Sequence, residues 1–252
     1  MRTKPSLGII GYGGFGSYLA DKLGLLFTIR TYDTRWPDAG PPPHATSLEA
    51  VCNCDLIVPA VPISALAQTC EAITRHVDDI MRPLIVDVCS VKLEPEAILK
   101  RSLPDGARYV LTHPLFGPKS APTTVRGRTI ALCGGSISDA DQQRVQAFFE
   151  RRLGLRVVHV SPDEHDRAMA RVQGLTHFIA QAFKAMTLDD TPLATDAYRQ
   201  LLSLQDVLSL DSWALFETIV AHNPYATGEI DRLMSSISDL RGRLPGKGES
   251  RH

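Results

Sequence analysis

The feature that most constrains this chain is the alternation of short apolar runs with helix-like segments over its first 160 residues. The runs are rich in Val, Ile and Leu and lack the polar alternation of a half-exposed strand. Such runs are typical of a parallel sheet that helices cover on both faces, so we expect an α/β domain at residues 1–160. The expected strands lie at residues 7–10, 27–32, 55–61, 83–88, 109–111, 129–133 and 155–160.

The pattern changes after residue 160. The sequence SPDE at residues 161–164 predicts a helix start, with a serine cap, proline at the first helical position and glutamate completing a capping box. From residue 168 to 186 nearly every helical face is apolar, so this helix must be buried on all sides. The rest of the chain is too short to wrap it alone. We therefore expect an all-helical domain at residues 161–240 that packs against a second copy of itself, and a disordered polar tail at 241–252.

The composition argues against several classes of function. The formal net charge is −1, which leaves no basic field to hold a nucleic acid or an anionic membrane. The sequence has no apolar run of membrane-spanning length, and its start, MRTKPSLGII, lacks the apolar core of a signal peptide, so we expect a cytoplasmic protein. The five cysteines form no C-x-x-C pair, so we expect buried thiols, no disulfide and no metal site.

A glycine-rich turn directly follows the first predicted strand. Gly11, Gly13 and Gly16 form the pattern G-x-G-x-x-G and open a predicted helix, which is the context of a Rossmann-type dinucleotide site. Asp33 ends the second predicted strand, where a carboxylate hydrogen-bonds the ribose 2′-hydroxyl of NAD. Arg35 is near enough to accept a 2′-phosphate, so NADP stays an alternative to the favoured NAD.

In an open α/β sheet, ligands bind outside the carboxyl ends of the strands. Three such ends meet at one predicted crevice: the glycine turn, residues 90–92, and His113. The predicted cofactor-binding residues are Gly11, Tyr12, Gly13, Gly14, Phe15, Gly16, Asp33, Val61, Pro62 and Ser90.

His113 stands out because two prolines restrict the chain around it. Pro114 pushes the histidine towards an extended backbone, and Pro118 further reduces the freedom of the loop. A rigid loop favours a group that must hold a reacting atom, and histidine can take a proton from a hydroxyl near neutral pH. The sequence therefore indicates a general base at His113, with a histidine satisfied by a backbone carbonyl as the alternative.

Four segments of the sequence carry a resemblance through their order and their separations. They are GIIGYGGFG, VDVCSVK, THPLFGPKSA and MARVQGLTHF. Together they resemble the prephenate/arogenate dehydrogenase family of tyrosine biosynthesis, over about residues 6–230. The combination of HPLFGP with DVCSVK is the most specific part of the resemblance. It implies an N-terminal Rossmann-type parallel-sheet domain, an all-helical dimerisation domain, and an enzyme that works as a homodimer.

The resemblance also implies a reaction. In that family NAD(P)+ accepts hydride from the hydroxyl-bearing carbon of a cyclohexadienyl acid while CO2 leaves and the ring becomes aromatic. The residue matching His113 hydrogen-bonds the substrate hydroxyl and takes up its proton, and the one matching Ser90 lies near the nicotinamide and the same hydroxyl. Both are thus predicted catalytic residues. The predicted substrate-binding residues are His113, His177, Gln173 and Lys92.

Two of these interpretations, those for His177 and Lys92, have structural alternatives. His177 lies among apolar residues and could be a core histidine, whereas the match to QGLTHF favours a pocket role. Lys92 could contact substrate or cofactor, or be an exposed lysine at a helix start. His165 also recurs in relatives, and we interpret it as structural.

Two other functions share parts of this pattern. A β-hydroxyacid dehydrogenase or imine reductase has the same layout but would need a catalytic lysine on the first helix of the all-helical domain. Lys184 lies far along it, and the HPLFGP loop would have no explanation. A catalytically inactive nucleotide-sensing regulator would be expected to lose His113 or Ser90, and both are present.

One family residue is missing. Many prephenate-using relatives carry an arginine that pairs with a substrate carboxylate, and Leu210 occupies its place here. Another cation must then pair with that carboxylate. The candidates are Arg126, Arg128 and Arg171. Asp206 and Asp211 add negative charge nearby, which would favour the ammonium of arogenate over dianionic prephenate unless both face solvent. We expect both substrates to react, with a lean towards arogenate.

Overall fold

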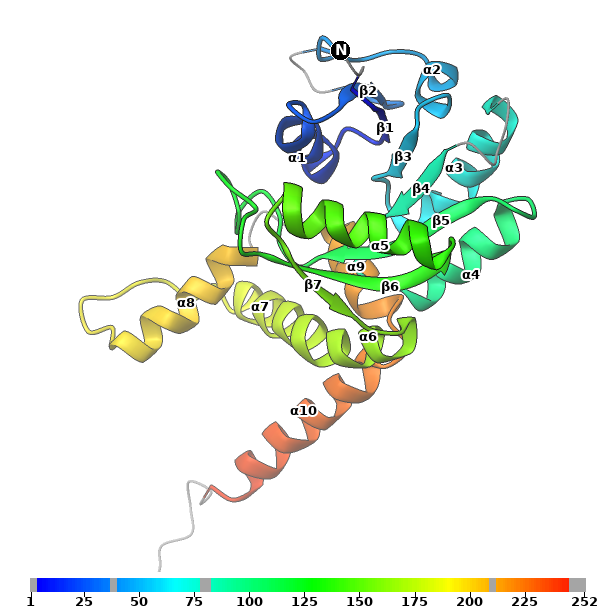
Figure 1. Ribbon diagram of the computed structural model, residues 1–252. Coiled ribbons are helices and arrows are strands. Elements are labelled where there is room, and N and C mark those ends of the chain that lie inside the picture. The colour runs from blue at the N-terminus through cyan, green and yellow to red at the C-terminus, as the bar shows by residue number, and fades with distance from the viewer. Residues whose placement is uncertain (1–3, 37–39, 78–82, 209–211, 245–252) are drawn as a thin grey trace, which may run out of the picture. The chain divides into compact units, whose positions relative to one another are not determined.

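The computed structural model describes residues 4–36, 40–77, 83–208 and 212–244, except for the side chains of residues 205–208 (Figure 1). Contacts within the chain divide it into two units, Met1–His165 and Asp166–His252. The division lies five residues beyond the boundary that the sequence predicts after residue 160.

The N-terminal unit contains a seven-stranded sheet in the order β2-β1-β3-β4-β5-β6-β7. The strands are β1 (Ser6–Ile10), β2 (Thr28–Tyr32), β3 (Leu56–Pro59), β4 (Leu84–Asp87), β5 (Arg108–Pro114), β6 (Thr129–Ser136) and β7 (Arg156–His159). They coincide with the seven predicted segments, although β5 and β6 extend further at their carboxyl ends. The extension of β5 is important because it includes His113 in the sheet.

The sheet is mostly parallel, and the prediction of a parallel sheet was wrong at one pair of strands. β5 and β6 pair antiparallel, with His113 opposite Ala131. The reason is the connection: residues 115–128 contain no helix or strand, and a parallel return needs a longer crossover, usually helical. Helix α5 (Asp139–Ala147) provides such a crossover, and β7 is again parallel to β6.

Helices lie on both faces of the sheet, as Figure 1 shows. They are α1 (Gly14–Leu23), α2 (Leu48–Cys52), α3 (Ile63–His76), α4 (Leu93–Ser102), α5, and a π-helical turn η1 (Phe148–Arg152). Each face has its own apolar core: Ile10 and Ile57 pack with α2, α3 and α4, whereas Ile9 and Val58 pack with α1 and Phe148. The sheet is therefore buried on both sides, as the apolar runs predict.

The C-terminal unit is helical. Helix α6 (Pro162–Met169) starts at the end of the first unit and continues through a π-helical segment, η2 (Ala170–Leu175), into α7 (Thr176–Ala185). Helices α8 (Asp196–Leu208), α9 (Trp213–Ala221) and α10 (Ala226–Gly242) follow. Close packing joins η2 to α10, because a Cβ added to Gly174 would lie 3.4 Å from that of Ala226. The uniform helix predicted for residues 168–186 is thus interrupted by a π-turn.

Three further sequence predictions can be compared with the structure. The capping box is confirmed: Glu164 accepts the Ser161 amide proton at 2.9 Å, and the Glu164 amide donates to the Ser161 hydroxyl at 3.2 Å. The five cysteines are free thiols, four of them buried. Helix α10 continues to Gly242, so residues 241 and 242 are helical rather than disordered, because the last turn of α10 is still hydrogen-bonded there; residues 245–252 of the predicted tail lie outside the described part.

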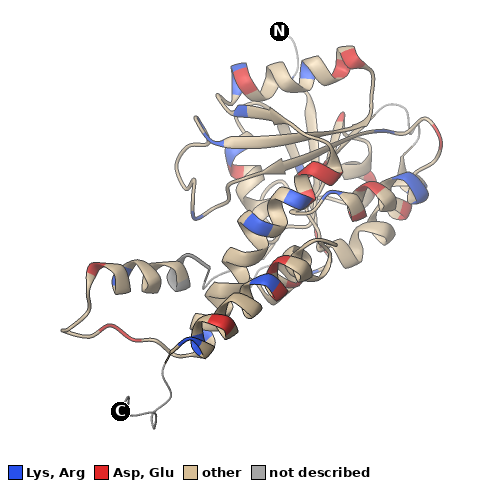
Figure 2. Ribbon diagram, turned by 90° about the horizontal axis from the view of Figure 1, so that it is seen from below, with Lys and Arg blue, Asp and Glu red and all other residues tan. Residues whose placement is uncertain are grey.

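Within the described ranges, no helix is both long and apolar enough to cross a lipid bilayer. Figure 2 shows Lys and Arg residues mixed with Asp and Glu along the helices, in agreement with the net charge of −1.

The contact between α1 and the turn after β1 can be tested with alanine. A Cβ at position 16 would lie 1.9 Å from the carbonyl oxygen of Gly11, so Gly16→Ala must push the helix away from the strand. We expect a loss of roughly 1–3 kcal/mol in the free energy of unfolding, measured by urea denaturation. Gly14→Ala is the matched control, because no atom lies within 4 Å of its added Cβ. Equal stabilities of the two variants would contradict this packing.

Candidate active site

The glycine turn after β1 has the shape of a phosphate cradle. Gly11 has a φ of 97°, and a Cβ there would lie 2.4 Å from the carbonyl oxygen of Ala60. Above Gly13 and Gly14 there is open space, since no atom lies within 4 Å of an added Cβ. The first backbone N–H groups of α1 lack partners inside the helix and carry the positive end of its dipole. The residues present therefore fit the pyrophosphate of a dinucleotide.

The predicted ribose-binding carboxylate lies beside this turn. Asp33 follows β2 and accepts hydrogen bonds from the amides of Tyr12, at 2.5 Å, and Arg35, at 2.8 Å. The Tyr12 ring in turn lies 5.8 Å from the ring of Trp36 and 5.6 Å from that of His44, measured between centroids. These bonds fix the carboxylate at the edge of the turn, where both its oxygens keep further acceptor capacity.

Other predicted cofactor residues lie just beyond the end of β3 and in the first turn of α1. Val61 contacts it, because its Cγ1 atom would lie 3.1 Å from a Cβ on Gly11. Pro62 caps α3, and the Phe15 ring lies 6.0 Å from that of Tyr18 on α1. The carboxyl ends of β1, β2, β3, β4 and β5 share one edge of the sheet because these strands are parallel.

Ser90 and Lys92 follow β4, and the structure places the lysine unexpectedly. Lys92 is completely buried at 0% exposure and forms an ion pair with the equally buried Asp87. It also donates to the carbonyl oxygen of Thr112 at 2.7 Å. The alternative of an exposed lysine at a helix start was wrong, because the side chain turns back under the loop. A direct contact of Lys92 with substrate stays a prediction.

Asp87 joins the strand ends together. Its Oδ1 accepts the amide proton of Cys89 at 3.1 Å, and its carbonyl oxygen accepts the hydroxyl proton of Thr112 at 2.6 Å. Asp87, Lys92 and Thr112 thus link the loop that carries half-buried Ser90 to the residue directly before His113. Sequence analysis missed Asp87, although the spacing in DVCSVK carried both charges of the pair.

His113 lies in β5 with only 3% of its surface exposed. Its Nδ1 atom is 2.9 Å from Nε2 of His165, and the two rings meet edge to face. Among the described residues the His113 ring makes this hydrogen bond through Nδ1 and none through Nε2. Burial lowers the pKa of His113 well below its usual value, and the neighbouring His165 and Lys92 lower it further. The imidazole is therefore neutral at neutral pH, the form that can accept a proton.

The predicted substrate residues of the C-terminal unit lie in the interrupted helix. Gln173 is in η2, and its Oε1 atom is buried without a hydrogen-bond partner in the described part of the chain. His177 is buried on the first turn of α7. π-Helical turns are frequent at functional sites, and an unpaired buried acceptor is costly unless a ligand satisfies it. The sequence carried no signal for this π-turn.

The candidate cations have different surroundings. Arg171 forms an ion pair with Glu229 at 2.8 Å. Arg126 and Arg128 are exposed, and the Arg126 guanidinium lies against Gly154. Leu210, Asp211 and the side chain of Asp206 lie outside the described residues. No cluster of three or more potential metal ligands occurs in the described ranges.

Comparison with known proteins identifies the family. Residues 43–158 match the model of the prephenate dehydrogenase nucleotide-binding domain, and residues 182–252 match the TYRAAT1-like C-terminal domain. Residues 43–158 of the chain therefore belong with the nucleotide-binding domains of the prephenate/arogenate dehydrogenase family. The resemblance seen in the sequence motifs is thus confirmed, and the N-terminal unit is a nucleotide-binding dehydrogenase domain of that family.

Relatives from plants and archaea support this assignment. Arogenate dehydrogenases 1 and 2 of Arabidopsis thaliana are 31% and 32% identical over 67% and 65% of this chain. The probable arogenate/prephenate dehydrogenase of Methanocaldococcus jannaschii is 25% identical over 77%. The matches cover 27%, 47% and 42% of these relatives, so the chain spans between a quarter and a half of their length. A solved prephenate dehydrogenase from A. aeolicus shares the fold, with a TM-score of 0.73, 19% identity, and coverage of 95% of this chain and 90% of that one.

The buried, neutral state of His113 predicts a pH dependence of stability. Because its pKa is lowered in the folded state, the unfolded chain binds a proton at this histidine below about pH 6.5 while the folded chain does not. We expect the wild type to lose stability relative to His113→Asn as the pH falls, with a slope approaching about 1.4 kcal/mol per pH unit. Urea denaturation between about pH 7.5 and pH 5 measures this difference. A constant difference across that range would contradict the burial of a neutral ring.

Proposed function

We propose that this chain catalyses the NAD(P)-dependent oxidative decarboxylation of arogenate, of prephenate, or of both, in tyrosine biosynthesis. The observation that carries the proposal is the environment of His113. This buried, neutral imidazole lies near the carboxyl end of β5, at the same edge of the sheet as the glycine turn. The family membership supports the same reaction, and the related chains from Arabidopsis thaliana are named arogenate dehydrogenases. The cytoplasmic location expected from the sequence stays a prediction.

Each residue of the site has a task in this reaction. NAD(P)+, when bound, supplies the hydride acceptor. The open first turn of α1 and the Asp33 carboxylate hold the phosphates and the ribose. His113 accepts the proton of the substrate hydroxyl as that carbon is oxidised, and Ser90 orients the same hydroxyl. The bond between the ring and its carboxylate then breaks, its electron pair makes the ring aromatic as CO2 leaves, and the phenolate oxygen takes the proton back. Arogenate thus gives tyrosine and prephenate gives 4-hydroxyphenylpyruvate.

The low pKa of His113 affects its efficiency as a base in two opposite ways. It keeps nearly all of the enzyme in the proton-accepting form at neutral pH, but it weakens the affinity of the ring for the proton. The surroundings that lower the pKa also exclude water and hold the ring in one place.

The activity is tested by following reduced nicotinamide with arogenate, prephenate and a panel of 3-hydroxyacids. We expect turnover of both cyclohexadienyl acids and none of the 3-hydroxyacids.

The role of His113 is tested by substitution. His113→Asn should lower kcat by roughly 10²–10⁴ while KM changes little, because it removes a group used in the transition state. A kcat within threefold of wild type would exclude His113 as the base.

We expect kcat/KM to be slightly higher for arogenate than for prephenate. A prephenate preference above about tenfold would direct attention to Arg126 and Arg128 as carboxylate partners.

The cofactor preference follows from Asp33. Its carboxylate would hydrogen-bond the 2′-hydroxyl of NAD and repel the 2′-phosphate of NADP. We expect wild type to prefer NAD+, and Asp33→Ser to shift the ratio of kcat/KM values towards NADP+. Arg35→Ala is the control, since loss of that exposed cation should weaken only the use of NADP+. A wild type that works better with NADP+ would show that Arg35 outweighs Asp33.

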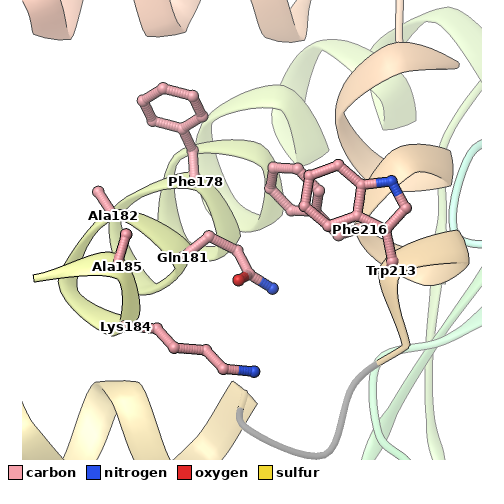
Figure 3. A pocket seen from close by; sticks show the side chains of 7 residues that line it. All are labelled: Phe178, Gln181, Ala182, Lys184, Ala185, Trp213 and Phe216. Atoms are coloured by element: carbon pink, nitrogen blue, oxygen red, sulfur yellow. The ribbon is translucent and has the colours of Figure 1, made fainter. Parts of the chain in front are cut away.

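We also propose that the C-terminal unit forms a homodimer. Helix α10 exposes Met234, Ile237 and Leu240 at helical spacing, each more than half exposed. Between α7 and α9 lies an apolar groove of about 390 Å³ (Figure 3), which is lined by Phe178, Gln181, Ala182, Lys184, Ala185, Trp213 and Phe216. Apolar side chains gathered in this way are typical of an association surface.

Light scattering at micromolar concentration tests this assembly. We expect wild type to be a dimer and Ile237→Asp to shift it towards monomer, because the new charge would be buried in the interface without a partner. Ser235→Asp adds the same charge to an exposed position on the opposite side of α10 and should leave the dimer intact. A monomeric wild type would refute the proposal.

A further inference from the structure

The contact between His113 and His165 restricts where their protons lie. The Nδ1 atom of His113 is 2.9 Å from Nε2 of His165, and the two side chains are 3% and 2% exposed. A neutral imidazole has one N–H donor and one acceptor nitrogen, so a hydrogen bond between two neutral rings needs a proton on only one of these two atoms. Which atom carries it determines the tautomer of His113.

The N-terminal unit holds His165 in this position through several independent bonds. Val160, just after β7, donates to the carbonyl oxygen of Leu132 on β6, the strand that pairs with β5. The capping box of Ser161 and Glu164 then fixes the start of α6, and the His165 amide donates to the Ser161 carbonyl at 2.9 Å. The rigid start of α6 thus places the imidazole of His165 next to the Nδ1 atom of His113.

We propose that His165 is a positioning residue: it accepts a hydrogen bond from the Nδ1–H group of His113 and thereby leaves Nε2 of His113 as the atom that takes the substrate proton. This inference rests on the proposed function of His113. The opposite arrangement, in which His165 donates to Nδ1, would put the ring proton of neutral His113 on Nε2 and remove the acceptor from the reacting side. The second nitrogen therefore sets the role of the first.

The charges around the pair support this arrangement. Burial, then His165 and the Lys92 ammonium group that Asp87 and the carbonyl of Thr112 hold, lower the pKa of His113 and so favour its neutral ring, which has a single N–H group. An oriented partner that fixes the tautomer of a catalytic histidine is a known requirement of general-base sites. A histidine that merely fills space would not need its nitrogen within hydrogen-bond distance of another.

Two substitutions separate the positioning role from a packing role. His165→Gln keeps a polar group of similar reach whose amide oxygen can accept from Nδ1–H, whereas His165→Leu fills the space without an acceptor. His159→Leu is the control, because His159 is an exposed histidine on β7 that bonds to Gln146 instead.

The direct readout is the ¹⁵N NMR spectrum of the full-length protein labelled at histidine, with His113 assigned by comparison with His113→Asn. We expect the Nδ1–H tautomer of His113 in wild type, His165→Gln and His159→Leu, and a substantial Nε2–H population in His165→Leu. With arogenate or prephenate, kcat of His165→Leu should fall by roughly 10-fold to 100-fold, less than the loss from removing the base itself, with KM nearly unchanged. His165→Gln should recover most of this loss.

Two results would overturn the inference. One is an Nε2–H tautomer of His113 in wild type, and the other is a His165→Leu variant that keeps both the Nδ1–H tautomer and the wild-type kcat. A wild-type chain that converts neither arogenate nor prephenate would refute the proposed function, and the spectra of the two His165 variants would still decide the tautomer.

Discussion

The buried ion pair between Asp87 and Lys92 is the interaction on which the rest of the site depends. Both side chains have no exposed surface, and removing two charges from water costs several kcal/mol per ion unless they are paired and hydrogen-bonded. Here the remaining groups are satisfied by the Cys89 amide and the Thr112 carbonyl. These partners belong to the segments that carry Ser90 and His113, so the pair cannot form unless those segments are correctly placed. Burial first, and then the neighbouring His165 and this ammonium group, lower the pKa of His113.

Two regions with different surroundings lie along one edge of the sheet. The turn after β1 offers open space above Gly13 and Gly14 and the backbone N–H groups at the start of α1, which suit a phosphate. The ends of β4 and β5 instead carry a network of hydrogen bonds around the buried His113. The antiparallel return of β6 makes this possible, because it and β7 lead the chain to α6, whose first turn places His165 against His113.

Much of this could be predicted from local sequence. The strands were recognisable because they are apolar on both faces, the glycine turn because its spacing meets a steric need, and the start of α6 because capping is a short-range interaction. The direction of β6 was missed since it depends on the loop at residues 115–128, which has no periodic pattern. The burial of Lys92, its pairing with Asp87 and the contact between His113 and His165 depend on strand register. Register brings together residues that are far apart in the chain, and no local pattern encodes it.

A double-mutant cycle on Asp87 and Lys92 tests the central claim, that these charges stabilise one another and hold the site together. The free energies of unfolding of wild type, Asp87→Asn, Lys92→Met and the double variant give the coupling between the two side chains. We expect a loss of about 3–5 kcal/mol for Lys92→Met, which leaves a buried charge unpaired. The double variant should be more stable than the sum of the two single losses implies, by about 2 kcal/mol or more. Losses that add to within about 0.5 kcal/mol would contradict it.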